Sequence, residues 1–321
     1  MIKRTLYFGN PAYLSMHNRQ LVIKLPEVEK NDALSEGFKK ETIATVPIED
    51  IGVLVLDEPQ VTITHALLST LLDNNVAVLT CDKTHLPNGY LMPLSGNTVQ
   101  TEKFKAQIEA TLPLKKNMWQ QTIQAKIINQ SVVLQRKNID IKNMLYWADS
   151  VKSGDPENYE ARAAAYYWKN IFEAFSEVTM PWENDIAEFK RERYGEPPNN
   201  LLNYGYAILR AIVARSLVSS GLLPTLGIHH HNRYNAYCLA DDIMEPYRPF
   251  VDEIVYSILK NNKNVQDLTT DLKKQLLGIA TVDVLINDER SPLMIATQRT
   301  TASVAKCYEG ELRKISYPAF C

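Results

Sequence analysis

The residue types best suited to chemistry are concentrated in residues 226–252. This stretch combines histidines, carboxylates, arginines and asparagines with apolar positions that are typical of a protein core. Burying so many ionisable groups is costly unless they pair with one another or bind a metal. A turn at Gly227 precedes three consecutive histidines (229–231), and Asp242 and Glu245 lie three apart on one face of the helix expected next. A histidine and a glutamate from this stretch would suit a divalent cation.

A second candidate is Glu160, in a helix expected from residue 156 onward. Asp155 can cap this helix and Pro156 can be its first residue, because proline lacks only an amide that would be unpaired there. Glu160 is the single acid on a face that it shares with Ala164, Tyr167 and Ile171. A carboxylate in such a stripe either has a raised pKa or lies against a cation.

The bulk composition indicates an ordinary globular chain. With 321 residues, 45% of them apolar and 22% charged, it can bury a large core and would usually form two domains. The net charge of -2 gives no reason by itself to expect a nucleic-acid partner. Residues 101–150, however, carry eight Lys and Arg against four Asp and Glu. This basic stretch is either a solvated helix face with core aromatics or a surface for phosphates.

The cysteines and the amino-terminal residues bear on the cellular compartment. The four cysteines are far apart and form no Cys-x-x-Cys pair, so neither a disulfide framework nor a structural zinc site is indicated. No apolar segment follows the two early positive charges, and no window approaches about twenty uninterrupted apolar residues. We therefore expect a cytoplasmic protein that is neither exported nor membrane-spanning.

The fold class expected from the patterns is α+β. The first part alternates strand-forming segments with turns, and it includes one helix over 62–75 and a charged segment, 27–41, expected to be a surface loop. Strands are expected at 4–9, 12–16, 20–25, 44–47, 52–56 and 76–80, with the second and third forming a hairpin.

The remainder of the chain has mainly helical spacing. We expect a small β-rich domain over 1–92, a linker over 93–100 and a larger, all-helical catalytic domain over 101–321. The charged, proline-bearing segment 176–198 is typical of a connector. An apolar helix follows from 199 to about 220, and its first asparagines either cap it or line a site. Further helices are expected around 252–261, 264–279 and 291–313.

Three motifs in this order resemble one protein family. They are Asp155-Pro-x-x-x-Glu160-Ala-x-Ala-Ala, Leu201-Leu-Asn-Tyr-Gly-Tyr206, and Leu226-Gly-Ile-His-His closing in Asp242-Ile-Met-Glu-Pro-Tyr-Arg-Pro249. Each is weak alone, but the three together resemble the integrase of CRISPR spacer acquisition, a CRISPR-associated endonuclease. The likeness covers nearly the whole chain and is greatest to members from type II systems.

The resemblance implies a catalytic metal site. In that family one glutamate, one histidine and one further acid bind a divalent ion, Mg²⁺ or Mn²⁺, and these positions match Glu160, His230 and Glu245. The three consecutive histidines depart from the usual pattern, so His229 and His231 remain alternatives to His230. Asp242, one turn before Glu245, is a candidate to support a ligand rather than bind the ion.

The resemblance also implies a reaction and partners. The reaction is the attack of a DNA fragment's 3′-hydroxyl on a phosphodiester of the CRISPR array, which inserts the fragment as a new spacer. The implied partners are double-stranded DNA, as spacer precursor and as repeat and leader, a second copy joined through the β-rich domains, the small dimeric adaptation partner and the system's effector nuclease. The setting would be the prokaryotic cytoplasm. Candidate DNA contacts beside the site are Lys152, Arg162, Arg210 and Arg233.

Structural alternatives exist for each ligand. Glu160 could pair with Arg162 or Arg210, His230 could cap a helix, and Glu245 could pair with the arginine three residues later. At the level of function, the alternatives are a metal-dependent phosphodiesterase without strand transfer and a DNA-binding scaffold without catalysis.

Overall fold

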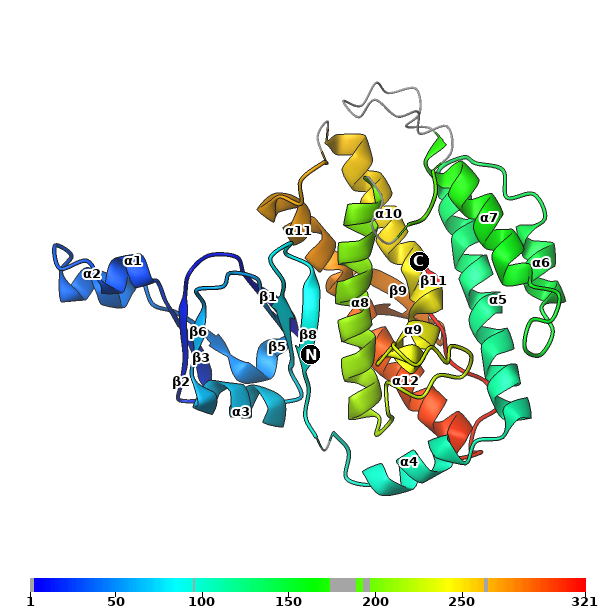
Figure 1. Ribbon diagram of the computed structural model, residues 1–321, viewed down its shortest axis with the longest axis horizontal. Coiled ribbons are helices and arrows are strands. Elements are labelled where there is room, and N and C mark those ends of the chain that lie inside the picture. The colour runs from blue at the N-terminus through cyan, green and yellow to red at the C-terminus, as the bar shows by residue number, and fades with distance from the viewer. Residues whose placement is uncertain (1–2, 95, 174–188, 193–196, 263–264) are drawn as a thin grey trace. The chain divides into compact units, whose positions relative to one another are not determined.

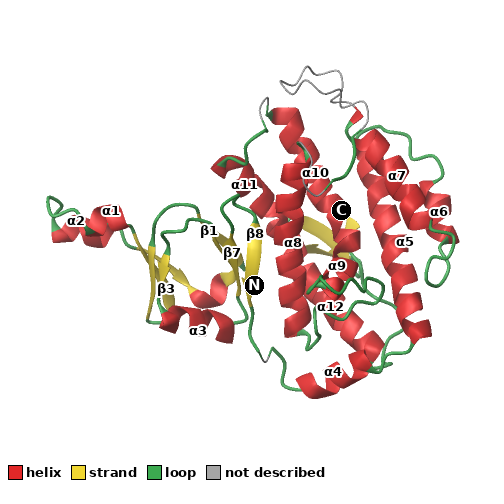
Figure 2. Cartoon of the chain, viewed as in Figure 1, coloured by secondary structure: helices red, strands yellow, loops and turns green. Residues whose placement is uncertain are grey.

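The computed structural model describes residues 3–94, 96–173, 189–192, 197–262 and 265–321 (Figure 1). The chain divides into two compact units, Met1–Gly96 and Asn97–Cys321. Strands dominate the first unit and helices dominate the second (Figure 2). Most of the expected connector at 176–198 lies outside the described residues.

The first unit contains two four-stranded sheets. One sheet has the order β1-β5-β7-β8, in which only β8 is antiparallel to its neighbour. Its strands are β1 (Arg4–Phe8), β5 (Ile51–Leu56), β7 (Ala77–Cys81) and β8 (Pro87–Leu91). The other sheet, β4-β3-β2-β6, is formed by β2 (Tyr13–His17), β3 (Gln20–Lys24), β4 (Ala44–Pro47) and β6 (Thr62–Ile63).

The hairpin predicted in this unit is confirmed. β2 and β3 pair antiparallel, with Tyr13 opposite Lys24. Asn18 and Arg19 form the turn with φ values of 48° and 59°, which match the right-handed twist of the flanking strands. The helix expected over 62–75 is α3 (His65–Asp73), preceded by the short strand β6. The fully buried Leu67 of this helix belongs to the core between the sheets.

The segment expected to be a loop, 27–41, is partly helical, so the prediction of a single helix was wrong. It contains α1 (Pro26–Glu29) and α2 (Glu36–Glu41), neither of which has a buried residue. Because no residue of α1 or α2 is buried, neither helix shows the apolar stripe by which a helix is recognised in a sequence. Their ends are instead set by Pro26 in the first turn of α1 and by the Ser35 side chain, which accepts a hydrogen bond from the amide of Phe38.

The second unit is built around the long helix α8 (Asn199–Ser219), against which α9, α10, α11 and α12 pack (Figure 1). α8 is apolar and long enough to span a membrane, but 78% of its most apolar window is buried, as in a core helix. A Cβ on Gly205 would lie 2.4 Å from Cγ1 of Val251, so glycine allows α8 and α10 to approach closely. The other helices are α4 (Gln100–Ile108), α5 (Leu112–Arg136), α6 (Met144–Ser150), α7 (Tyr159–Ile171), α9 (Cys238–Met244), α10 (Arg248–Asn261), α11 (Thr270–Leu277) and α12 (Leu293–Tyr308), with the 3₁₀ turns η4 (Glu245–Tyr247) and η5 (Gly278–Thr281).

The second unit also contains a sheet, so the expectation of an all-helical domain was wrong. Strands β9 (Asp283–Ile286), β10 (Glu289–Pro292) and β11 (Ala319–Phe320) form an antiparallel sheet in the order β10-β9-β11. Each strand has four residues or fewer, which is too short for an alternating pattern to be recognised. The Phe320 ring stacks on Phe250 of α10 at 4.0 Å, which ties the sheet to the helices.

Candidate active site

The candidate site lies within the second unit, where α7 and η4 both pack against α5. Asp155 positions the start of α7 by accepting hydrogen bonds from the amides of Tyr159 and Glu160, each at 2.9 Å. The helix begins at Tyr159 rather than Pro156, because Asp155 and Asn158 both have positive φ values in the turn before it. Asp155 therefore caps the helix as expected, but from four residues upstream, and places Glu160 in the first turn.

Glu160 and Glu245 converge on one ammonium group. The Nζ atom of Lys126 lies 2.7 Å from Oε1 of Glu160 and 2.7 Å from Oε2 of Glu245. The side chains of Lys126 and Glu245 are 10% and 6% exposed, whereas that of Glu160 is 26% exposed. Arg248 contacts the other oxygen of Glu245 at 3.0 Å. Two carboxylates from distant parts of the chain thus share a partly enclosed site.

The neighbouring cations determine the charge state of Glu245. Burial alone would raise the pKa of this carboxyl, but the charges of Arg248 and Lys126 outweigh burial and lower the pKa to about 2. Burial would also lower the pKa of Lys126, yet the charges of Glu245 and Glu160 raise it. At neutral pH the acid and the amine are therefore both ionised.

His230 is oriented by the fully buried Asp242. One Asp242 oxygen accepts hydrogen bonds from the amides of Ile228 and His229, at 2.7 and 3.0 Å, and the other lies 2.5 Å from Nδ1 of His230. A Cβ on Gly227 would lie 2.8 Å from this carboxylate, so the turn requires glycine. Because an ionised carboxylate only accepts hydrogen bonds, Nδ1 is the donor, and Nε2 of a neutral ring keeps its lone pair.

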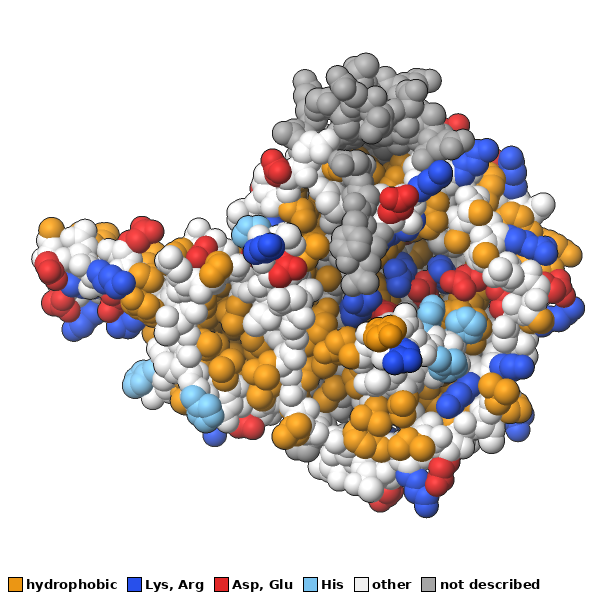
Figure 3. Space-filling view, viewed as in Figure 1, with side chains coloured by type: hydrophobic (Ala, Val, Ile, Leu, Met, Phe, Trp, Pro, Cys, Tyr) orange, Lys and Arg blue, Asp and Glu red, His pale blue; other side chains and the backbone are white. Residues whose placement is uncertain are grey.

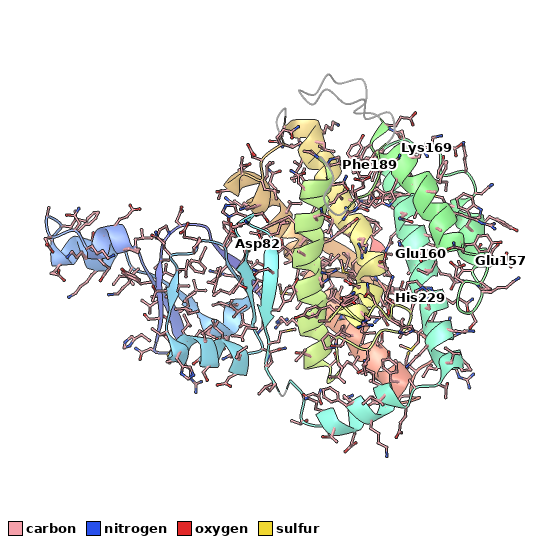
Figure 4. All side chains as sticks on the ribbon, in the orientation of Figure 1. Asp82, Glu157, Glu160, Lys169, Phe189 and His229 are labelled. Carbon is pink, nitrogen blue, oxygen red and sulfur yellow. The ribbon has the colours of Figure 1, made fainter. Side chains whose placement is uncertain are left out.

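The other two histidines have different environments. His229 stacks on Trp119 of α5, with ring centroids 4.0 Å apart and an interplanar angle of 3°. Burial and the neighbouring His230 lower the pKa of His229. His231 is exposed. The hydrogen bond with Asp242 raises the pKa of His230, and the charges of Asp242, Glu245 and Glu160 act in the same direction. Figure 4 shows His229 and Glu160 in the same region of the helical unit.

The donor set fits a divalent cation. In the part of the chain that the structure describes, no three His, Cys, Asp or Glu side chains are already gathered into a metal-binding arrangement, since Lys126 lies between the glutamates. Oε2 of Glu245 is buried and lies 2.7 Å from the Lys126 ammonium, so this oxygen could coordinate an ion once the ammonium left it. Two carboxylates and an imidazole nitrogen are suitable ligands for Mg²⁺ or Mn²⁺.

Of the contacts considered as alternatives to metal binding by Glu160, Glu245 and His230, only the ion pair of Glu245 is present. Glu160 pairs with Lys126 rather than with Arg162 or Arg210, and Arg210 instead binds Asp241 through Nε at 2.6 Å. The pair between Glu245 and the arginine three residues later does form. His230 hydrogen-bonds to Asp242 rather than capping a helix from its side chain.

Each candidate DNA contact interacts with a residue other than the proposed metal ligands. Lys152 pairs with Glu157 at 2.7 Å, and the guanidinium groups of Arg162 and Arg233 each lie 5.0 Å from the centroid of a tyrosine ring. In the space-filling view, histidine, acidic and basic side chains gather on one face of the helical unit (Figure 3). A role for these cations in binding DNA remains a prediction.

Sequence reasoning missed Lys126 and Trp119 as parts of the site. Lys126 was counted only as one cation of the basic stretch 101–150. The signal was nevertheless present, because Lys126 lies at helical spacing from the buried Trp119 and Ile123 and is therefore a charge on an apolar face. This is the same pattern that identified Glu160 in α7.

Comparison with known proteins decides the family. The model of the family described as "CRISPR associated protein Cas1" matches residues 6–288. The chain belongs to the Cas1 family. Among curated Cas1 proteins, the chain is 33% identical over 306 residues to the CRISPR-associated endonuclease Cas1 of Neisseria meningitidis serogroup C (strain 8013), covering 94% of this chain and 91% of that protein.

Solved structures share the Cas1 fold. A casposase bound to integration product superposes with a TM-score of 0.75 at 18% identity, covering 98% of this chain and 92% of that one. A chain of a Cas6-RT-Cas1–Cas2 complex gives a TM-score of 0.71 at 19% identity, covering 98% of this chain and 36% of that one. At these identities the likeness concerns the fold.

Proposed function

We propose that this Cas1-family protein is a metal-dependent DNA endonuclease and integrase that inserts short DNA fragments into a CRISPR array as new spacers. The observation that carries the proposal is the convergence of Glu160 and Glu245, from α7 and η4, on Lys126 of α5. A histidine whose Nδ1 is held by a buried acid packs against Trp119 of the same helix. The names of the endonuclease relative and of the casposase bound to integration product support the reaction class.

Glu160, Glu245 and Nε2 of His230 would hold the divalent ion. Bound there, Mg²⁺ or Mn²⁺ would polarise the scissile phosphate and stabilise charge on the attacking and leaving oxygens. Glu245 is suited to this role because it stays ionised at neutral pH. Asp242 would fix the tautomer and orientation of His230, as carboxylates commonly do for histidine ligands.

The attacking group is supplied by the DNA. A 3′-hydroxyl displaces an array oxygen in transesterification, and water in its place gives nuclease cleavage. The protein therefore needs positioning and electrostatic stabilisation rather than a nucleophilic side chain. Cations around the site would position phosphates without reading sequence, so DNA binding should weaken steeply with salt.

The proposal is tested by strand transfer. The purified protein, with its small dimeric partner, is mixed with a 3′-hydroxyl DNA fragment and a repeat-containing plasmid in Mn²⁺ or Mg²⁺. Joined products are expected, and a fragment with a 3′-deoxy end should give none. Glu160→Ala should abolish joining while DNA affinity stays nearly unchanged, whereas Glu157→Ala, which alters the nearby exposed acid, should leave joining nearly intact.

Two outcomes would favour the alternative functions. Cleavage in Mn²⁺ without joined products would indicate a phosphodiesterase without strand transfer. DNA binding without any metal-dependent reaction, in the wild type and in Glu160→Ala alike, would indicate a scaffold.

The assembly we propose is a homodimer joined through the β-rich units, with two such dimers bridged by a dimer of the small partner. The structural neighbour from a Cas1–Cas2 complex supports a partner of this kind, and the effector nuclease of the same system is a further proposed partner. Mixing the protein with the small partner should give a discrete larger species in light scattering. A monomer that forms no complex would contradict this assembly.

A further inference from the structure

Lys126 is a nearly buried lysine that contacts two carboxylates. Lysine is almost never fully buried unless it is paired, and this side chain is 10% exposed within the apolar face of α5, next to the fully buried Ile123 and Ile127. Its ammonium lies at 2.7 Å from both Glu160 and Glu245. A buried monovalent cation thus already bridges the two carboxylates that the proposed function assigns to the metal.

The charges at this cluster are balanced. Glu160 and Glu245 contribute two negative charges, and Lys126 and Arg248 contribute two positive charges. With the buried Asp242 carboxylate behind His230 also counted, adding a divalent ion with every partner in place would still leave an excess positive charge in a poorly solvated site. Like charges a few ångströms apart repel strongly there, so the ion and both cations do not fit together.

Arg248 is the better anchored of the two cations. It contacts Oε1 of Glu245, and its guanidinium carbon also lies 4.7 Å from the centroid of the Tyr206 ring. Lys126, in contrast, makes its ion pairs with the two proposed ligands. Glu160 is the more exposed of these acids, 26% against 6% for Glu245, so a movement of the ammonium into solvent would pass on the Glu160 side.

We propose that Lys126 is a resident counter-cation whose ammonium exchanges with the divalent ion. Before metal binding it holds the carboxylates of Glu160 and Glu245 together against their mutual repulsion. On metal binding it leaves them and turns toward solvent. This inference rests on the proposed function, because it takes the two glutamates as metal ligands. Lys126 is therefore a positioning residue that sets how tightly the site binds its ion.

The first test measures Mn²⁺ affinity by calorimetry on the full-length protein at constant pH and ionic strength. Lys126→Met keeps the apolar stem and removes the competing charge, so Mn²⁺ should bind at least tenfold more tightly than to the wild type. Lys137→Met is the matched control, since Lys137 also belongs to the α5 region but pairs with Glu253. Its Mn²⁺ affinity should equal that of the wild type. Equal or weaker binding by Lys126→Met would overturn the proposal.

A second measurement uses the wild type and does not depend on the variant's folding. Amine-reactive labelling followed by mass spectrometry reports the accessibility of each lysine. Labelling of Lys126 should be slow without metal and at least severalfold faster at saturating Mg²⁺, whereas labelling of Lys137 should not change. Equal labelling of Lys126 with and without Mg²⁺ would show that its ammonium does not leave the carboxylates.

The two proposals fail in distinguishable ways. If Glu160→Ala and Glu245→Ala bind Mn²⁺ as tightly as the wild type, the assigned metal site is wrong. If both variants lose Mn²⁺ binding but Lys126→Met leaves the affinity unchanged, the metal site stands and the exchange with Lys126 is wrong.

Discussion

Glu245 in η4 and Asp252 in α10 are buried carboxylates of the same part of the chain, 5% and 1% exposed, whose pKa values are shifted in opposite directions. Lys126 and Arg248 contact Glu245, and their charges outweigh burial and lower its pKa to about 2. For Asp252 burial prevails and raises the pKa to about 7. Glu245 is therefore ionised at neutral pH, whereas the pKa of Asp252 is close to neutral pH.

The partners of Asp252 explain the difference. Its two oxygens accept hydrogen bonds from the hydroxyls of Tyr167 and Tyr206, at 2.9 and 2.5 Å, and these bonds lower its pKa only partly against burial. Asp252 thereby links α7, α8 and α10 through neutral donors. The comparison teaches that burial alone does not mark a metal ligand. We propose that the ligand is the acid whose charge neighbouring cations maintain, which is Glu245.

The largest expected effect separates the two acids by function. Glu245→Gln and Asp252→Asn are both near-isosteric and both remove a charge. Glu245→Gln should slow DNA joining at least about a thousandfold, because the loss of a metal ligand forfeits several kcal/mol of transition-state stabilisation. Asp252→Asn should slow joining by less than about tenfold. Initial rates of joined product measure both, and comparable losses would break the comparison.

The next effect concerns stability without metal. Lys126→Met leaves two carboxylates without their shared cation, and breaking a buried pair in this way costs about 3 kcal/mol of unfolding free energy. Lys137→Met should cost at most about 1 kcal/mol, because Glu253 keeps its contact with Arg136 at 3.3 Å. Urea denaturation in the presence of a chelator measures both. A cost below about 1 kcal/mol for Lys126→Met would show that its ion pairs add little.

Asp242 extends the comparison to a third buried acid, whose partners are N–H groups. Asp242→Asn should weaken Mn²⁺ binding about 10- to 100-fold, because the carboxamide presents an NH₂ group where hydrogen bonds are now accepted and no longer orients His230. Calorimetric titration with Mn²⁺ measures this effect. Unchanged affinity would mean that His230 needs no support from Asp242 or is not a ligand.

The smallest effect is the pH dependence of stability. Since the pKa of Asp252 rises from 3.8 unfolded to about 7 folded, the folded state binds the extra proton, and stability falls as pH rises through this window. Asp252→Asn should reduce that fall by about 2 kcal/mol between pH 5 and 7. The Glu245 contribution has the opposite sign and is lost as pH falls from 4.5 toward 2. Denaturation curves from pH 5 to 8 would contradict this account if both proteins had the same slope.

The sequence predicted the elements with strong patterns and missed those without them. The β2–β3 hairpin and the helix α8 follow from strand alternation and from a long apolar run, and both are present. Helices α1 and α2 bury no residue, and strands β9 and β10 have four residues each, so neither kind of element leaves a periodic signal. Short elements of this kind are stabilised by caps, turns and tertiary contacts.

The candidate site was predictable residue by residue only in part. The isolated Glu160 and the stretch ending in Glu245 could be recognised because ionisable groups stood among apolar positions. That both acids share Lys126 could not be recognised, because the contact depends on how α5, α7 and η4 pack. The family resemblance made Asp242 a candidate to support a ligand, but its hydrogen bonds to the histidine turn depend on the loop's backbone conformation.

The central claim is that Glu160, Glu245 and His230 bind one divalent ion. It is tested most directly by a crystal soaked in Mn²⁺ and measured at the manganese absorption edge. We predict one strong anomalous peak within bonding distance of both glutamate carboxylates and of Nε2 of His230, with the Lys126 ammonium turned away. A peak elsewhere, or Lys126 still bridging the two carboxylates at saturating Mn²⁺, would contradict the account.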